Sequence, residues 1–188
     1  MVDIEGQSFK SIDFSIEGFK KGEYTKCVFT QCNLSEQDLT DSNFSECEFL
    51  ICNLSMVNLH SVAFRNIKFK DCKLLGVHFE HCNEFLFEVG FENCQLDLSS
   101  FYKLGLKKTI FKNCSLHEVD FTLCDLTQAV FEECSLMGAT FDNTKLESCD
   151  FRTAFHYAIN PEINKIKKAK FSVQGLPGLL YQYGIEVE

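Results

Sequence analysis

Two cysteines and two histidines between residues 72 and 82 are the side chains best suited to metal chemistry in this sequence. Cys72, His78, His81 and Cys82 are residue types that bind zinc, and a structural zinc site needs four such ligands in a tetrahedron. They form a site only if their side chains converge on one point. Whether they converge depends on the element that carries them.

Nucleophilic catalysis needs a nucleophile, a histidine and an acid in a fixed geometry beside a pocket. The chain has five His and many Ser, but it contains no nucleophile-elbow motif and no phosphate-binding loop. We therefore expect no enzymatic activity, no catalytic residue and no cofactor.

Acidic side chains are the strongest chemical signal, because the formal net charge is -9. Residues 27–60 contain five acids and neither Lys nor Arg, whereas the segment from about 65 to 112 is slightly positive. The candidate acidic partner-binding surface consists of Glu36, Asp38, Asp41, Glu46, Glu48, Glu118, Asp120, Glu132 and Glu133.

An acidic protein binds DNA poorly, because affinity for DNA comes largely from cations that neutralise phosphates. Such a protein can instead occupy a basic groove of another protein, and its electric field then aids their encounter. We expect a protein partner and no direct contact with nucleic acid. A surface that only keeps the protein soluble explains the same charge, so charge alone leaves both hypotheses open.

Large apolar residues at every fifth position indicate the backbone structure that carries the acidic, histidine and cysteine side chains described above. From residue 111 to residue 151 they are Phe111, Leu116, Phe121, Leu126, Phe131, Leu136, Phe141, Leu146 and Phe151. A small residue stands two positions before each, as Cys114 does before Leu116. A period of five fits neither a helix nor a strand. The backbone must therefore turn a corner every five residues and point the same two side chains inward.

The sequence also repeats with a longer period of twenty residues, which is four times the first. Once two inserted residues within 80–90 are removed, Phe recurs at Phe9, Phe29, Phe49, Phe69, Phe91, Phe111, Phe131, Phe151 and Phe171. Four five-residue steps thus close one coil, and like residues stack in successive coils, as in a solenoid. About eight coils with a spacing of ~4.8 Å give a rod on the order of 40 Å long. After the insertion we expect the inward series to resume at Leu86 and Phe91.

The repeat also predicts which way the potential metal ligands point. Every Cys falls in the small inward slot, whereas His78 and His81 fall at outward positions. Because the four ligands then cannot converge, we expect no metal site. Disulfides would not follow the repeat, and the number of Cys is odd, so we expect reduced cysteines that act as small buried hydrophobic residues.

Segments such as Cys32-Asn33-Leu34-Ser35 and Cys124-Asp125-Leu126-Thr127 match the consensus A-(D/N)-L-x-x, so the chain resembles the pentapeptide-repeat family from Phe9 to about Phe171. The resemblance implies an all-β fold, a right-handed quadrilateral parallel β-helix of about eight coils with a short C-terminal capping helix. We expect one domain over residues 1–188. Its repeats span about 9–173, with the two-residue insertion within 80–90, and residues 174–188 form the C-terminal cap.

The repeat decays after Ala154, although Leu176 still keeps its phase. Residues 175–181 are typical of a short apolar helix begun by Pro, and residues 184–187 are typical of a strand. A solenoid needs a covered end, so this segment is either a simple cap or a cap that also buries apolar side chains against a second copy. The family resemblance implies such a homodimer. The candidate cap and dimer residues are Leu176, Leu179, Leu180 and Tyr181.

The resemblance also suggests a partner. The Qnr and mycobacterial MfpA-type members look like acidic rods of duplex-like width that bind DNA gyrase. By this resemblance we expect an acidic DNA mimic that binds DNA gyrase or topoisomerase IV, both type II topoisomerases, and confers quinolone resistance on a bacterium. This chain lacks the large projecting loops of Qnr proteins, so it would be MfpA-like. The alternative is a general structural or adaptor scaffold with an unrelated protein partner.

The sequence contains no long apolar run and no basic segment followed by an apolar stretch near Met1. The first absence argues against a membrane-spanning helix, and the second argues against a signal peptide. We therefore expect a cytoplasmic protein without membrane contact.

Overall fold

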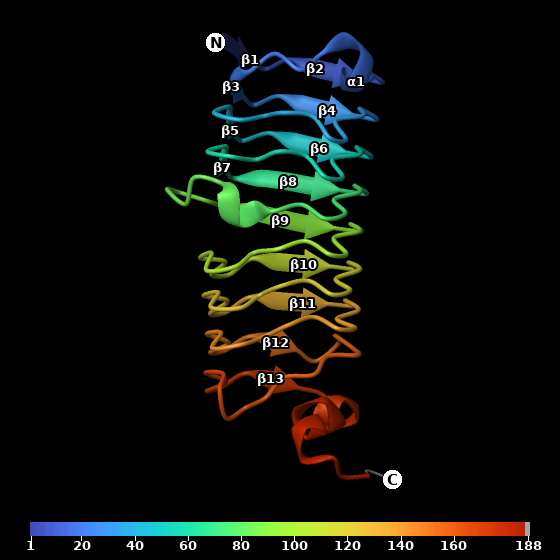
Figure 1. Cartoon of the computed structure of the whole chain (residues 1–188), viewed down its shortest axis with the longest axis vertical. Coiled ribbons are helices and arrows are strands. Elements are labelled where there is room, and N and C mark those ends of the chain that lie inside the picture. Colours follow the sequence, from blue (N-terminus) through green and yellow to red (C-terminus); the bar gives the residue numbers. More distant parts are fainter. Residues whose placement is uncertain (187–188) are drawn as a thin grey trace.

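The structure is a computed structural model that describes residues 1–186, and it forms a rod of stacked coils (Figure 1). All strand pairs are parallel and belong to two sheets. The nine-stranded sheet contains, in chain order, β2 (Ser8–Lys10), β4 (Val28–Thr30), β6 (Glu48–Leu50), β8 (Ile67–Lys70), β9 (Val89–Glu92), β10 (Ile110–Lys112), β11 (Val130–Glu132), β12 (Asp150–Phe151) and β13 (Lys170–Phe171). The four-stranded sheet contains β1 (Val2–Glu5), β3 (Gly22–Thr25), β5 (Asn43–Ser45) and β7 (Ala63–Arg65).

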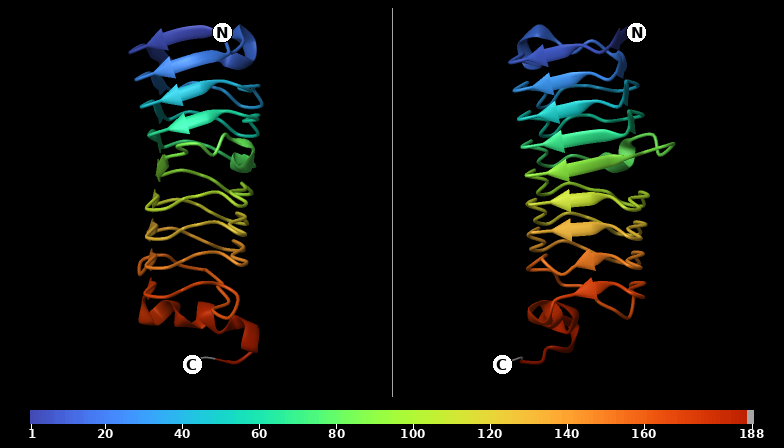
Figure 2. Two further views of the ribbon diagram at one scale, coloured as in Figure 1. Left: turned by 90° about the vertical axis from the view of Figure 1, so that its left-hand side faces the viewer. Right: turned by 180° about the vertical axis from the view of Figure 1, so that it is seen from behind.

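Like residues stack because successive strands pair one coil apart. Phe111 lies opposite Phe131, twenty residues later. The structure confirms the expected right-handed quadrilateral β-helix of about eight coils. Two further views of the whole rod show the same stack of coils (Figure 2). We name its four faces A, B, C and D after four buried residues of one coil: Phe111, Leu116, Phe121 and Leu126. The nine-stranded sheet forms face A, and the four-stranded sheet lies on face D.

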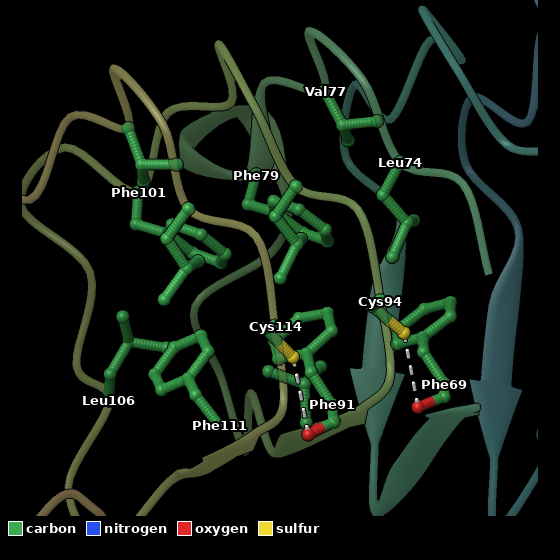
Figure 3. Packing of buried hydrophobic residues seen from close by; sticks show 14 of the residues in the cluster. Phe69, Leu74, Val77, Phe79, Phe91, Cys94, Phe101, Leu106, Phe111 and Cys114 are labelled. Atoms are coloured by element: carbon green, nitrogen blue, oxygen red, sulfur yellow. Dashed lines mark hydrogen bonds between the residues drawn. The ribbon is translucent and has the colours of Figure 1, made fainter. Parts of the chain in front are cut away.

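Stacked phenylalanines fill the interior (Figure 3). The rings of Phe111 and Phe131 lie 4.9 Å apart and nearly parallel, and Phe111 meets Phe121 edge-on at 5.8 Å. Where the small inward slot holds Cys, Ser or Thr, its side chain commonly donates to a backbone carbonyl of the preceding coil. The Cys94 thiol, for example, donates to the carbonyl oxygen of Phe69 at 3.4 Å. All eleven cysteines are buried and free of disulfides, so sulfur here serves packing and weak hydrogen bonding.

Most corners of the coils are made by a residue with left-handed backbone. In one coil the corner residues are Asn113, Glu118, Leu123 and Gln128, with φ between 50° and 63°. Their N–H groups donate to the next coil, as Gln128 does to the carbonyl oxygen of Glu147 at 2.9 Å. Where Asn or Asp precedes a buried centre, its side chain supports the turn, because Asx side chains bond to the backbone two residues on. The Asn33 side-chain oxygen thus accepts from the N–H of Ser35 at 3.2 Å.

The register changes once, between β8 and β9, where Phe69 pairs with Phe91 and the step is twenty-two residues. The 3-10 helix η1 (Phe79–His81) leads into this segment, and the chain leaves the outline of the rod between η1 and β9 (Figure 1). The sequence-based expectation that Leu86 resumes the inward series is wrong. Leu86 is 62% exposed, and Phe87 packs against the core in its place, 6.4 Å from the ring of Phe64.

The C-terminal segment consists of two 3-10 helices, η2 (Val173–Leu179) and η3 (Tyr181–Tyr183). Leu176 is 44% exposed, so its expected place in the inward series is wrong. The expected strand over 184–187 does not form at residues 184–186, and Val187 lies outside the described residues. The remaining helix, α1 (Phe14–Glu17), has four residues. Within residues 1–186, no helix has the length and apolar character needed to cross a membrane.

Candidate protein-interaction surfaces

Corners place most of the candidate acids on the outside of the rod. Five of the nine occupy the left-handed corner position: Glu36, Asp41, Glu46, Glu118 and Glu133. All five are exposed. A corner residue projects between two faces, where neither sheet nor core covers it, so these carboxylates are available to a partner.

The two candidate acids on face A are paired with lysines of neighbouring coils. Glu48 lies 3.3 Å from Lys68, and Glu132 lies 3.2 Å from Lys112. A further pair joins Lys70 to Glu92 at 3.2 Å. Face A therefore carries alternating charge rather than the continuous negative strip that a DNA mimic requires.

Asp38 and Asp120 are the two candidate acids on face C. Hydrogen bonds from the Lys21 ammonium and the Thr40 hydroxyl hold the pKa of Asp38 at about 2. Asp38 is thus ionised at neutral pH, but the positive charge of Lys21 balances its negative charge in an ion pair. The backbone N–H of Thr122 donates to the Asp120 carboxylate at 2.8 Å, which uses this side chain to stabilise its own turn.

The structure does not gather the nine acids into one patch. They lie on four different corners and two faces, and only Glu36 and Glu118 share a corner, the one between faces B and C. Four coils separate these two residues, and the corner positions between them hold Met56, Gly76 and Leu98. Met56 is 62% exposed and Leu98 is 61% exposed. The side of the rod formed by this corner and face C is therefore acidic at two levels and apolar between them.

Of the residues considered for zinc, the cysteines lie inside the rod and the histidines lie on its outer surface. Cys72 and Cys82 are buried inside the rod. His78 stacks on His81 outside, with ring centres 5.5 Å apart, and its Nδ1 lies 2.9 Å from the Glu80 carboxylate. Across residues 1–186 no three His, Cys, Asp or Glu side chains come together in a way that could hold a metal ion.

Sequence reasoning missed the lysine partners of the acids, although a signal for them exists. Several ion pairs join residues one coil apart, and opposite charges stand twenty positions apart at Glu48 and Lys68 and at Lys112 and Glu132. The same rule finds Asp125 and Lys145, whose charged atoms lie 3.0 Å apart on face D. Comparing charges at the coil period would therefore have identified Glu48 and Glu132 as paired acids.

Asp125 stabilises face D through charged partners on both sides. Its Oδ2 lies 3.0 Å from the Lys145 ammonium and 3.4 Å from that of Lys107, and the Thr127 hydroxyl donates to its Oδ1 at 2.6 Å. Burial of this carboxyl opposes ionisation. The hydrogen bonds from Thr127 and Lys145 outweigh it and lower the pKa of Asp125 from 3.8 to about 2.

We expect Asp125→Asn to lower the free energy of unfolding at pH 7 by about 1–2 kcal/mol. The folded-state pKa lies below the ordinary value, so the contribution is complete above about pH 4 and disappears as the pH falls through about 2. Urea unfolding at pH 7, 4 and 2.5 measures the difference between the two proteins. The exposed Asp142→Asn is the matched control with little effect. A difference for Asp125→Asn that stays constant from pH 7 down to pH 2.5 would contradict the assignment.

The cap residues split into two groups. Leu179 packs against the core and Leu180 is half-buried, whereas Leu176 is 44% exposed and Tyr181 is 55% exposed. Gly178 fixes the docking of η2, because a Cβ atom there would lie 2.3 Å from the backbone oxygen of Tyr157. The cap thus covers the last coil with one side and presents apolar side chains on the other.

Comparison with known proteins agrees with this geometry. A family model described as a pentapeptide repeat region matches residues 2–83 and 85–154. No curated protein matches the sequence. Among solved structures, QnrB1, a plasmid-mediated fluoroquinolone resistance protein, has a TM-score of 0.51 and 15% sequence identity, over 96% of this chain and 99% of that chain. HetL, a pentapeptide repeat protein involved in heterocyst differentiation regulation from the cyanobacterium Nostoc sp. strain PCC 7120, has a TM-score of 0.51 and 13% identity, over 92% of this chain and 88% of that chain. At these identities the likeness concerns the fold.

Proposed function

The chain belongs to the pentapeptide-repeat family, and we propose that it acts as a non-catalytic rod that binds another protein through its acidic side. The observation that carries this proposal is the set of exposed corner carboxylates, above all Glu36 and Glu118 on the corner between faces B and C. A rigid scaffold fixes the backbone that carries these carboxylates before binding, and their negative charge suits a basic partner surface. All of residues 1–188 act as one domain in this proposal.

The specific partner that we propose is a bacterial type II topoisomerase in the cytoplasm, DNA gyrase or topoisomerase IV. Such an enzyme has a basic groove for DNA, and an acidic rod in that groove would mimic DNA and confer quinolone resistance. The net charge of -9 and the family resemblance support this partner. The balanced charge of face A argues that the contact uses the side formed by face C and the corner between faces B and C.

The test is DNA supercoiling by gyrase, titrated with this protein in the presence and absence of a quinolone. The variant in which Glu36, Asp38, Glu118 and Asp120 are all changed to Lys should abolish the inhibition or drug rescue seen with the wild type. A matched control changes Asp3, Glu5, Glu17 and Glu23 to Lys, which alters the net charge equally at the N-terminal end. The control should retain the effect. Absence of any effect of the wild-type protein on gyrase at high concentration would exclude this partner.

The second candidate function is a structural or adaptor scaffold with an unrelated protein partner. The distribution of the acids favours it, because exposed apolar residues Met56 and Leu98 interrupt the acidic corner. A scaffold of this kind binds through mixed apolar and charged patches, and its complexes depend less on salt than those of a DNA mimic.

We further propose that the exposed side of the cap joins two copies of the rod end to end. Leu176 and Tyr181 supply the apolar contact. Light scattering of the purified protein should then give twice the chain mass, and the double change Leu176→Asp and Tyr181→Asp should give the monomer mass. Leu179→Asp is no suitable control because Leu179 packs on the core, whereas exposed Ile163→Asp is. A monomeric wild-type protein at high micromolar concentration would exclude the dimer.

A further inference from the structure

Gly90 is an outward residue of β9 on face A, and nothing in the fold requires a glycine there. Its backbone is not left-handed, and a Cβ atom on it would meet no atom within 4 Å. The residues on either side of it in the same column are Lys68 and Ile110. A glycine inside a strand costs backbone entropy, and where the fold does not need one it often marks a place where a ligand or another backbone comes close.

The missing side chain opens a hollow, which we call the Gly90 site. It occupies about 500 Å³ along the corner between faces D and A, and its walls are three successive turns of that corner, residues 66–68, 86–90 and 107–110. A second hollow of about 300 Å³ continues over face A and shares Lys68, Gly90 and Ile110 with the first. The two form one open groove across the strands, with Gly90 at its floor.

Apolar side chains border this groove without a partner in the rod. Leu86 and Ile110 line it, with exposures of 62% and 52%. Next to Leu86 stands Phe85, which is 68% exposed. Phe87 packs against the core and anchors the segment, which projects from the rod in Figure 1 and in the right-hand view of Figure 2. A fixed projection that presents two adjacent large apolar side chains to solvent suits a binding surface.

The charge around the groove is positive, although the protein as a whole is acidic. Five lysines line the two hollows, against three acids: Lys68, Lys70, Lys107, Lys108 and Lys112, and Glu48, Glu88 and Glu92. Lys68 pairs with Glu48 and Lys107 with Asp125. Lys108 forms no ion pair with any acid of residues 1–186 and stands at a left-handed corner. The groove therefore favours an anionic occupant.

We propose that the Gly90 site binds an extended acidic peptide segment of a partner protein, with an apolar side chain between its carboxylates. The bare backbone of Gly90 lets the peptide main chain approach β9 closely. The lysines receive the carboxylates, and Leu86 and Ile110 receive the apolar side chain. A nucleic acid fits less well, because its affinity comes from many unpaired cations and the apolar wall gives it nothing.

This site is separate from the acidic surface of the proposed function. The corner between faces D and A lies diagonally opposite the corner between faces B and C, which carries Glu36 and Glu118. One rod can therefore hold an acidic segment at the Gly90 site and a basic surface at the opposite corner at the same time. The inference does not depend on the identity of the partner bound by the acidic side.

The probe is a fluorescent peptide of sequence Asp-Asp-Leu-Asp-Asp-Leu-Asp-Asp, titrated with the full chain and followed by fluorescence anisotropy. We expect saturable binding that weakens as salt is raised. Gly90→Val fills the hollow with a residue that the same column carries at Val28 and Val130, so its melting temperature should be equal to or above that of the wild type. It should nevertheless weaken binding at least about tenfold. The matched control Val130→Ile adds bulk in the same column two coils away and should bind like the wild type.

Two more variants separate the contributions to binding. Lys108→Glu should weaken the binding of the peptide, and Lys108→Arg should preserve it. If Gly90→Val folds poorly, Gly90→Ser, which matches Ser8 in the column, takes its place. Equal binding by Gly90→Val and wild type would overturn the proposal, as would equal binding of a peptide with Leu replaced by Asp. Preferential binding of a DNA oligonucleotide over the peptide would also overturn it and would indicate a general polyanion surface.

Discussion

Phe111→Ala should lower the free energy of unfolding by about 3–5 kcal/mol. Phe111 is fully buried, stacks between Phe91 at 5.3 Å and Phe131 at 4.9 Å, and meets Phe101 and Phe121 edge-on. The substitution removes one ring from a continuous column, and the paired strands β9 and β11 on either side of β10 cannot collapse into the gap without breaking register. Urea unfolding followed by circular dichroism measures the loss.

Phe85→Ala is the matched control for this prediction, because Phe85 is 68% exposed on the projecting segment. It should change the free energy of unfolding by less than about 0.5 kcal/mol. Since each coil contacts only its neighbours, unfolding need not be a single cooperative step. Hydrogen exchange should therefore accompany the urea experiment and should show the largest loss of protection in the coils next to residue 111. A near-neutral effect of Phe111→Ala would contradict the assignment of the inward face.

Gln128→Pro should destabilise the rod by at least about 3 kcal/mol, although the side chain contributes little to packing. Proline fixes φ near the value of ordinary right-handed structure, whereas Gln128 has φ of 63°. Proline also lacks the N–H that donates to the Glu147 carbonyl at 2.9 Å. The thermal unfolding midpoint reports both losses together.

Gln128→Gly tests the same corner in the opposite direction. A left-handed conformation costs a residue with a side chain roughly 1 kcal/mol relative to glycine, so Gln128→Gly should leave the melting temperature unchanged or raise it slightly. A strong destabilisation by Gly would show that the Gln128 side chain, rather than the backbone conformation, stabilises the corner. The pair of variants therefore separates the two explanations.

The fold followed from the sequence because its period is enforced at every coil. Inward residues such as Phe111 and Cys114 are buried where the repeat places them. The errors occurred where the period is interrupted. Phe85, Leu86 and Phe87 are all apolar, so composition could not show which of them returns to the core after a two-residue insertion. The second interruption is at Pro177, where the chain forms the 3-10 helix η2 instead of another coil. The position of Leu176 in the five-residue repeat therefore no longer implies burial.

The interaction surface was less predictable than the fold. Sequence alone assigned Glu36 and Glu118 to the candidate acidic surface, and the structure has them at exposed corners. Which acids share a side, and which are neutralised, depends on residues one coil away, such as Lys68 beside Glu48. The groove at Gly90 depends on the lack of a side chain on glycine, and a single glycine does not form a recognisable sequence motif. Its signal was a glycine in a column of larger residues.

The in-register stacking of Phe on Phe in parallel strands is also the arrangement found within amyloid fibrils, where each layer is a separate chain. Here the layers are linked covalently, so the number of layers is set by the gene instead of by the supply of monomer. Templated growth is then confined to the two ends of the stack. At one end η2 lies over the last coil, and at the other β1 and β2 are the terminal strands of their sheets. The first coil is therefore where recruitment of a further chain by strand addition would begin, and charged side chains such as Asp3, Glu5 and Lys10 at that edge oppose it.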